Sequence, residues 1–322
     1  MNKAQQQEQE QPSVSLVLGS GGARGLAHIG AIQALEEAGY RIVCISGSSM
    51  GALVGGMYAA GKLKDYADWV SRLEQSDVFR LVDWTFSGGG LIRGDKIIRR
   101  LHDMVGDVKI EDLAVEFTAV AVDIEQGREI WLSDGALFDA IRSSIAIPGL
   151  FTPHRYRNRL LVDGGILNPV PVAPTLRKIS DLLVVINVNG PAEPVPENSK
   201  TRESSQESKP SREPDSSSED GLKERMRNFF NDLVDRDSDQ KPEPTPGLVA
   251  MLMKSLETMQ SMITRQHLAV FQPDLVVEVP KDACMVHEFH RGKQLIELGY
   301  QRTSEALKHL GHQAVQSDHR LE

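Results

Sequence analysis

The first 60 residues alternate between short apolar runs and stretches with helical spacing. Residues 14–18 and 41–46 are apolar runs of strand length, and helical patterns follow at about 26–38 and 50–60. Gly39 suits the end of the first helix, because glycine readily adopts the left-handed conformation found there. A strand–helix–strand–helix order is typical of a parallel sheet with helices on its faces. The pattern therefore predicts an α/β fold.

Later apolar runs extend this prediction. Strands are expected at 116–123, 129–133, 159–162, 182–188 and 275–279, and helices at about 248–271 and 291–310. Four methionines recur along the helix at 248–271 and are expected to face the core: Met251, Met253, Met259 and Met262. Since no run reaches the roughly 18 consecutive apolar residues of a membrane span, we predict no transmembrane helix.

One segment differs from the rest in composition. Residues 191–220 contain eight serines and five prolines but only two apolar residues. Such a segment cannot bury enough apolar surface to offset the entropy lost on ordering. We therefore predict one α/β domain that is interrupted by a disordered insert and flanked by two tails. The predicted boundaries are a disordered tail at 1–13, the domain at 14–310, the insert at about 191–246 and a polar tail at 311–322.

Within the insert, residues 221–236 show helical spacing of apolar side chains. This pattern predicts a short amphipathic helix, which either folds back onto the domain or docks on a membrane surface or a partner.

Charge and cysteine content narrow the function classes. The chain has 36 Lys and Arg against 45 Asp and Glu, a net charge of −9, which argues against nucleic-acid binding. Cys44 and Cys284 are too few for a disulfide framework or a four-cysteine zinc site. Residues 1–13 are polar and lack the pattern of a secretory signal, so we expect a cytoplasmic protein. Peripheral contact with the inner face of a membrane stays open.

The strongest chemical signal is the sequence GSSMG at residues 47–51, which fits G-x-S-x-G. It lies where a predicted strand leads into a predicted helix, the context of a nucleophile on a sharp turn. Gly47 and Gly51 would leave room for that turn. The N-terminus of the helix behind Ser49 would favour developing negative charge. We therefore predict that Ser49 is a nucleophile.

A glycine-rich loop, GSGGARG at residues 19–25, follows the first strand. A P-loop would need a Lys followed by Ser or Thr, and a dinucleotide site would need glycine where Arg24 stands. The N–H groups of Gly21 and Gly22 could instead form an oxyanion hole. A βα turn without chemistry is the remaining alternative.

A nucleophilic serine also needs a base. None of the nine histidines lies in a recognisable strand-end motif, and we interpret each as a surface or core residue. Asp163 ends the strand at 159–162 and precedes two glycines, so its carboxylate is expected at the sheet edge where α/β proteins place active sites. An ordinary Asp-Gly turn is the alternative.

Together these motifs resemble the patatin-like phospholipases, in the bacterial branch similar to the catalytic domain of neuropathy target esterase. GSGGARG, GSSMG and DGG (residues 163–165) occur in the family's order, and residues 144–148 and 289–301 are also similar. The resemblance covers about residues 14–190 and 246–310.

The resemblance implies a three-layer α/β/α sandwich around a mostly parallel sheet. It also implies hydrolysis of lipid acyl esters through an acyl-serine, by a dyad of Ser49 and Asp163. The oxyanion hole would consist of the backbone at Gly21, Gly22 and Ala23, supported by Arg24. No cofactor or metal would be needed. Ser20 departs from the glycine that many family members carry at this position.

Two other hypotheses stay open from the sequence. An α/β-hydrolase could combine Ser49 and Asp163 with a late histidine in a triad. Alternatively, the chain could be a non-catalytic regulatory or adaptor protein that retains a hydrolase-like pocket, with the insert recruiting partners.

Overall fold

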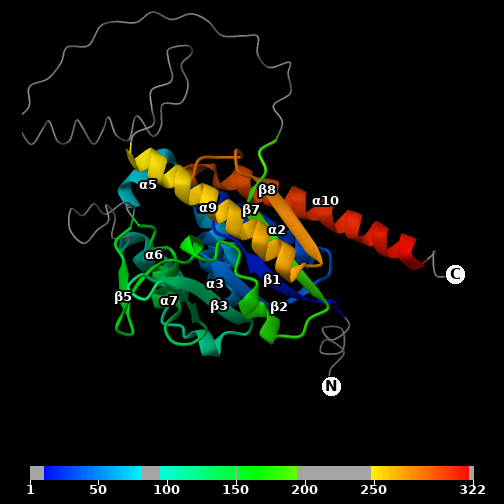
Figure 1. Ribbon diagram of the computed structural model, residues 1–322, viewed down its shortest axis with the longest axis horizontal. Coiled ribbons are helices and arrows are strands. Elements are labelled where there is room, and N and C mark those ends of the chain that lie inside the picture. Colours follow the sequence, from blue (N-terminus) through cyan, green and yellow to red (C-terminus); the bar gives the residue numbers. More distant parts are fainter. Residues whose placement is uncertain (1–10, 82–94, 149–150, 194–247, 319–322) are drawn as a thin grey trace, which may run out of the picture. The chain divides into compact units, whose positions relative to one another are not determined.

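The computed structural model describes residues 11–81, 95–148, 151–193 and 248–318 (Figure 1). The chain divides into two compact units, one formed by Met1–Glu193 with Met259–Glu322 and the other by Pro194–Thr258. In the second unit, the described residues are 248–258, the first part of a long helix. The predicted insert therefore lies outside the described residues from 194 onward, as does the amphipathic segment at 221–236.

The first unit is built on an eight-stranded sheet. Its strands are β1 (Ser13–Leu18), β2 (Arg41–Ser48), β3 (Glu116–Asp123), β4 (Arg128–Leu132), β5 (His154–Tyr156), β6 (Arg159–Asp163), β7 (Leu182–Gly190) and β8 (Leu275–Pro280). The strand order is β5-β6-β3-β2-β1-β7-β8, and β4 also pairs with β3. Strands β3, β2, β1, β7 and β8 are parallel, whereas β4 and β6 run antiparallel to β3 and β5 runs antiparallel to β6.

Helices connect these strands. The α-helices are α2 (Ala27–Glu37), α3 (Met50–Ala59), α4 (Leu63–Val70), α5 (Gln75–Leu81), α6 (Asp95–Val105), α7 (Leu137–Ser144), α9 (Leu248–Phe271) and α10 (Gly292–Asp318). Shorter 3-10 helices are η1 (Gly22–Leu26), η2 (Ile110–Asp112), η3 (Gly164–Ile166), η4 (Ala173–Arg177) and η6 (Phe289–Arg291). Among the helices of the described residues, none combines the length and apolar character that a bilayer crossing requires.

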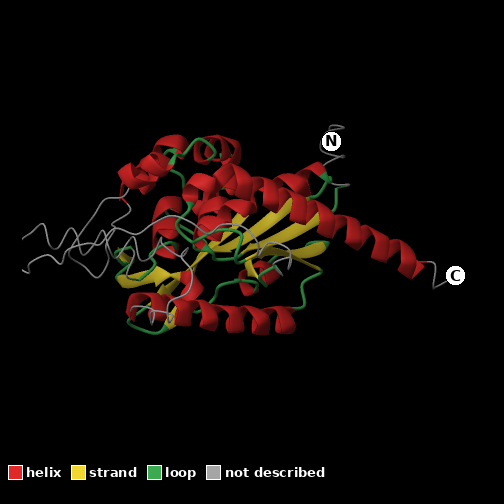
Figure 2. Cartoon of the chain, turned by 90° about the horizontal axis from the view of Figure 1, so that it is seen from above, coloured by secondary structure: helices red, strands yellow, loops and turns green. Residues whose placement is uncertain are grey.

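Successive side chains of β1 point to opposite faces of the sheet. Because helices pack on both faces, the fold has three layers. Leu16 and Leu18 pack into the larger core with side chains of α2, α3 and α10. Val17 faces the other way, in a smaller cluster joined by Leu268 and Phe271 of α9. Figure 2 accordingly shows helices on both sides of the sheet. This arrangement confirms the predicted α/β/α fold with its mostly parallel sheet.

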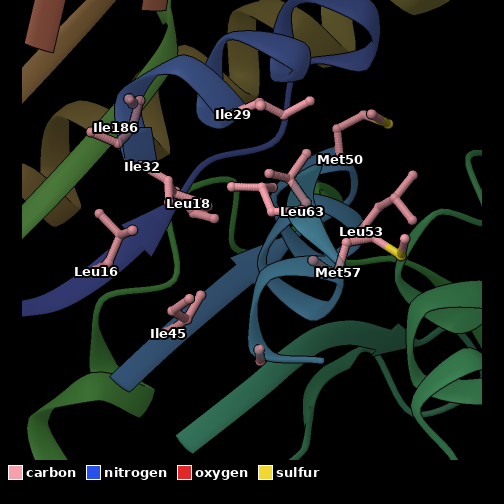
Figure 3. Packing of buried hydrophobic residues seen from close by; sticks show 14 of the residues in the cluster. Leu16, Leu18, Ile29, Ile32, Ile45, Met50, Leu53, Met57, Leu63 and Ile186 are labelled. Atoms are coloured by element: carbon pink, nitrogen blue, oxygen red, sulfur yellow. The ribbon is translucent and has the colours of Figure 1, made fainter. Parts of the chain in front are cut away.

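The larger core lies directly behind the β2–α3 turn. Ile45 of β2, with Leu53 and Met57 of α3, meets Leu18 of β1 and Ile32 of α2 there (Figure 3). Each of these side chains is almost completely buried. The turn that carries Ser49 is therefore supported from behind by close packing, which resists its relaxation.

Three sequence predictions need correction. β1 begins at Ser13, whose N–H and hydroxyl both donate to Asp181. Residues 311–318 of the predicted polar tail continue α10, because extending an established helix adds one hydrogen bond for each residue that is fixed. The methionine prediction is wrong for Met251, Met259 and Met262, which are all at least half exposed. Leu268 and Phe271 are the α9 side chains that pack against the sheet.

Candidate active site

Ser49 occupies the turn between β2 and α3. Its backbone has φ 56° and ψ −124°, a conformation that residues with side chains rarely adopt. A β-carbon at Gly47 would overlap the backbone of Gly51, and one at Gly51 would overlap the Leu18 carbonyl. Both flanking positions therefore have room for glycine only, as expected for a sharp turn that presents a nucleophile.

The strained turn is held by a serine to which the sequence analysis gave no role. The Ser49 N–H donates to Ser144 Oγ at 2.9 Å, and the Ser144 hydroxyl donates to the Val120 carbonyl at 2.6 Å. Ser144 is fully buried at the end of α7, 95 positions along the chain. A serine within a largely apolar stretch was the only local sign of such a contact.

Asp163 ends β6 and is 3% exposed. Its Oδ1 accepts the Gly165 N–H at 2.7 Å, and its side chain has a hydrogen-bonding interaction with Ser49. No hydrogen bond between these two side chains meets ordinary geometry among the described residues, and Asp163 Oδ2 has no partner there. Catalytic hydrogen bonds are often long in enzymes without substrate and tighten in the complex. The structure thus brings the two predicted catalytic residues together.

Burial raises the pKa of Asp163 to about 6. Removal of water from the charged carboxylate is the main cause, and the Ser49 and Gly165 hydrogen bonds oppose it by favouring the charged form.

Asp163 was expected at the sheet edge formed by the carboxyl ends of parallel strands, but β6 brings it to the site by another route. It runs antiparallel to β3, so its carboxyl end is not aligned with those of the parallel strands. It pairs first through Leu161 with Asp123, at the end of β3, and then runs inward until Asp163 lies opposite Ala121. The neighbouring Val120 of β3 pairs with Ser48 at the end of β2. Asp163 therefore arrives one strand away from the Ser49 turn.

The glycine-rich loop lies against the turn that carries Ser49 and against the residues that follow Asp163. A β-carbon at Gly25 would overlap Met50, and one at Gly165 would lie 2.9 Å from Ser20 Oγ. The Ala23 N–H donates to the Val286 carbonyl at 2.9 Å, so this predicted oxyanion donor is already engaged. In the described part of the chain, the N–H groups of Gly21 and Gly22 have no hydrogen-bond acceptor. Two of the three predicted N–H donors are therefore available to an oxyanion.

Arg24 belongs to this loop and is 6% exposed. It donates to the Lys281 carbonyl at 3.0 Å and to Asn189 Oδ1 at 2.6 Å. The guanidinium thereby links the glycine-rich loop to the β8–α10 connection and to the end of β7.

Two comparisons with known proteins identify the chain. Residues 16–176 match the family described as patatin-like phospholipase. An uncharacterized NTE family protein of Mycobacterium bovis is 39% identical over 92% of this chain and 92% of its own. The chain belongs to the patatin-like phospholipases. The family resemblance inferred from the three motifs is thereby confirmed, and it places the protein among lipid esterases and phospholipases.

More distant relatives match in part. The lysophospholipase nte1 of Emericella nidulans is 33% identical over 55% of this chain and 12% of its own length. The crystal structure of VipD from Legionella pneumophila covers 93% of this chain and 67% of that chain, with 14% identity and a TM-score of 0.42. That score is too low to add to the fold assignment, which stands on the family match.

Several histidines of this patatin-like phospholipase have partners other than Ser49 and Asp163 in the described residues. His28 is buried with its pKa lowered to about 4 by desolvation, and its Nε2 bonds the Gly19 carbonyl at 2.8 Å. His154 pairs with Asp139, and His267 bonds the Val170 carbonyl. Across the described ranges, no histidine is recorded as a hydrogen-bond partner of Ser49 or Asp163. Nor do those ranges contain three or more His, Cys, Asp or Glu side chains grouped to hold a metal.

Proposed function

We propose that this patatin-like phospholipase is a serine acyl hydrolase that cleaves lipid acyl esters through an acyl-serine intermediate. The carrying observation is the pairing of Ser49, held at φ 56°, with a buried Asp163 carboxylate. Family membership supports the lipid substrate class. The triad and adaptor alternatives have no comparable support in the described residues.

In the first half-reaction, Asp163 accepts the Ser49 hydroxyl proton as Oγ attacks the ester carbonyl carbon. The carbonyl electron pair moves to oxygen, and the N–H groups of Gly21 and Gly22 stabilise the resulting oxyanion. The positive end of α3 adds to this stabilisation. When the tetrahedral intermediate collapses, Asp163 returns the proton to the departing alcohol and an acyl-Ser49 ester is left.

In the second half-reaction, water replaces the serine as nucleophile. Asp163 takes a proton from water, whose oxygen attacks the acyl-Ser49 carbonyl, and the same two N–H groups hold the new oxyanion. Collapse releases the fatty acid, and the proton on Asp163 returns to Ser49 Oγ. The cycle therefore needs one base and one oxyanion hole, without a histidine.

An aspartate is a weak base at its ordinary pKa of about 3.9. Burial that raises the pKa of Asp163 to about 6 brings it closer to neutral pH, where proton transfer from serine is less unfavourable. Exclusion of water also strengthens the interaction between Asp163 and Ser49.

Phospholipids and lysophospholipids are the substrates to test first, because one relative is named as a lysophospholipase. Since such lipids reside in bilayers or micelles, we also propose transient contact with a lipid surface during catalysis.

Labelling with a fluorophosphonate probe, followed by peptide mapping, tests the nucleophile. We expect the wild-type protein to be labelled on Ser49 alone and Ser49→Ala to lose both labelling and hydrolysis. Ser48→Ala is the matched control, because its buried hydroxyl has no hydrogen-bond partner in the described structure. It should retain labelling. Wild-type turnover by Ser49→Ala would disprove the assignment of the nucleophile.

A further inference from the structure

The peptide between Ser20 and Gly21 is held by the side chain of Asn189. Asn189 Nδ2 donates to the Ser20 carbonyl at 2.6 Å. Asn189 Oδ1 accepts from Arg24 Nη2 at 2.6 Å. The backbone of Asn189 is restrained in turn, because its N–H donates to Asn187 Oδ1 at 3.1 Å. Both polar ends of the Asn189 side chain are therefore occupied, and its orientation is determined.

This contact fixes the direction of an oxyanion donor. The Ser20 carbonyl and the Gly21 N–H belong to one planar trans peptide, in which they point in opposite directions. Holding the carbonyl against Asn189 therefore turns the Gly21 N–H away from Asn189. The Ser20 N–H, bonded to the Pro169 carbonyl at 2.8 Å, restrains the preceding peptide in the same way.

The hydrogen bond from Asn189 to the Ser20 carbonyl also polarises the Gly21 N–H. The Arg24 charge, anchored on the Lys281 carbonyl, donates to Asn189, which donates to Ser20. Hydrogen bonds in such a chain strengthen one another, particularly where water is scarce. A peptide whose carbonyl accepts a hydrogen bond is a better N–H donor at its other end. The Arg24 charge thus acts on the oxyanion through two hydrogen bonds and one peptide.

We propose that Asn189 is a positioning residue for the oxyanion hole, which aims and polarises the Gly21 N–H. The inference rests on the proposed acyl transfer at Ser49. No motif marks Asn189 in the sequence, because it lies 169 positions from its partner Ser20, one residue before the end of an otherwise ordinary strand.

Asn189→Asp tests this role with little change of shape. The carboxylate still accepts from Arg24, but its second oxygen meets the Ser20 carbonyl without a proton to donate. Asn189→Ala removes both contacts. Asn158→Asp, the same chemical change at an exposed position of the β5–β6 hairpin, is the matched control.

The decisive readout is inhibition by an aliphatic trifluoromethyl ketone. Ser49 Oγ adds to its carbonyl carbon, the proton passes to Asp163, and the carbonyl oxygen becomes an oxyanion in the proposed hole. Loss of a whole oxyanion donor lowers kcat by about 10²–10³ in proteases. Because Gly21 keeps its N–H, we expect a smaller loss, of about tenfold to hundredfold in kcat, for both Asn189 variants.

The inhibition constant of the ketone should rise by the same factor, while KM for a soluble ester stays within about twofold. Each rate is divided by the amount of Ser49 that the fluorophosphonate probe labels at completion. Partly unfolded preparations therefore remain informative. Asn158→Asp should match the wild type. A merely structural role would lower the unfolding midpoint without this parallel change in kcat and ketone binding.

Two failures are distinguishable. If the wild type binds the ketone in a Ser49-dependent manner but both Asn189 variants equal it, the positioning role is wrong and the proposed function stands. If Ser49→Ala hydrolyses esters and binds the ketone like the wild type, the proposed function itself fails, and the Asn189 proposal fails with it.

Discussion

Asp163 is buried at the expense of folding stability. The pKa of its carboxyl is about 6 in the folded chain against 3.8 for an exposed aspartate. Between these values the folded protein holds a proton that the unfolded chain has released, so stability falls as pH rises from about 4 to about 6. The ionised carboxylate then lowers the free energy of unfolding by on the order of 3 kcal/mol at neutral pH. An active base at this position thus requires a destabilised site.

The same shift sets the pH dependence of hydrolysis. Only the ionised Asp163 can accept the Ser49 proton, so activity should fall as pH drops through the folded pKa. We expect the acidic limb of kcat/KM for a soluble ester to have an apparent pKa near 6, with a slope of one proton. A pH profile between 4 and 9 measures it, with circular dichroism at each pH to show that the protein stays folded. A flat profile down to pH 4 would contradict Asp163 as the base.

At the residue scale, the sequence predicted the groups that local motifs describe. Ser49 and Asp163 each stand beside glycines, where a β-carbon would overlap neighbouring atoms. Ser144, Asn189 and Val286 were missed, because each acts through one contact with a residue far along the chain. The engagement of the Ala23 N–H by Val286 could not be inferred for the same reason.

At the scale of elements, helices α2 and α10 cross at unusually close range. A β-carbon at Gly30 of α2 would overlap the Ile296 carbonyl of α10, and one at Gly299 would overlap the Ala27 carbonyl. The two backbones therefore touch at paired glycines. Because α2 continues directly from η1 and the glycine-rich loop, this crossing anchors one side of the candidate site.

Substitutions in these helices should have opposite effects. Gly30→Ala forces the two helices apart, and we expect it to lower the free energy of unfolding by about 1–3 kcal/mol or more. Gly311→Ala lies in the same α10 helix with no atom near the added β-carbon, and should raise stability by up to about 1 kcal/mol. Urea denaturation of both variants measures the difference. Equal stability of Gly30→Ala and the wild type would show that the crossing is not tight in solution.

Element positions were predictable where the hydrophobic period was strong. The strand at 116–123 and the helix at 248–271 agree with the structure at both ends. Helix α4 and strand β5 were missed, since a short element shows too few repeats to establish a period. The antiparallel direction of β6 was not predictable, because direction depends on pairing across the sheet rather than on the strand's own residues.

At the scale of the whole molecule, the predicted insert lies in a connection between two elements, where added residues need not disturb the sheet. β7 and β8 are adjacent and parallel, and such strands need a crossover that carries the chain back to the start of the next strand. Helix α9 provides this return in sequence. In sequence, the predicted insert therefore falls within a single connection, between β7 and α9.

Replacement of residues 194–247 by a Gly/Ser linker of about 12 residues tests this argument, since such a linker spans roughly 20 Å on average. We expect a cooperative unfolding transition and turnover of a soluble short-chain ester within about twofold of the wild type. Turnover of phospholipid in vesicles, measured in parallel, reports any contribution of the insert to lipid contact. A Gly/Ser linker of the full original length is the control that separates length from composition. If neither replacement folds while the wild type does, residues 194–247 belong to the domain itself and the predicted interruption is wrong.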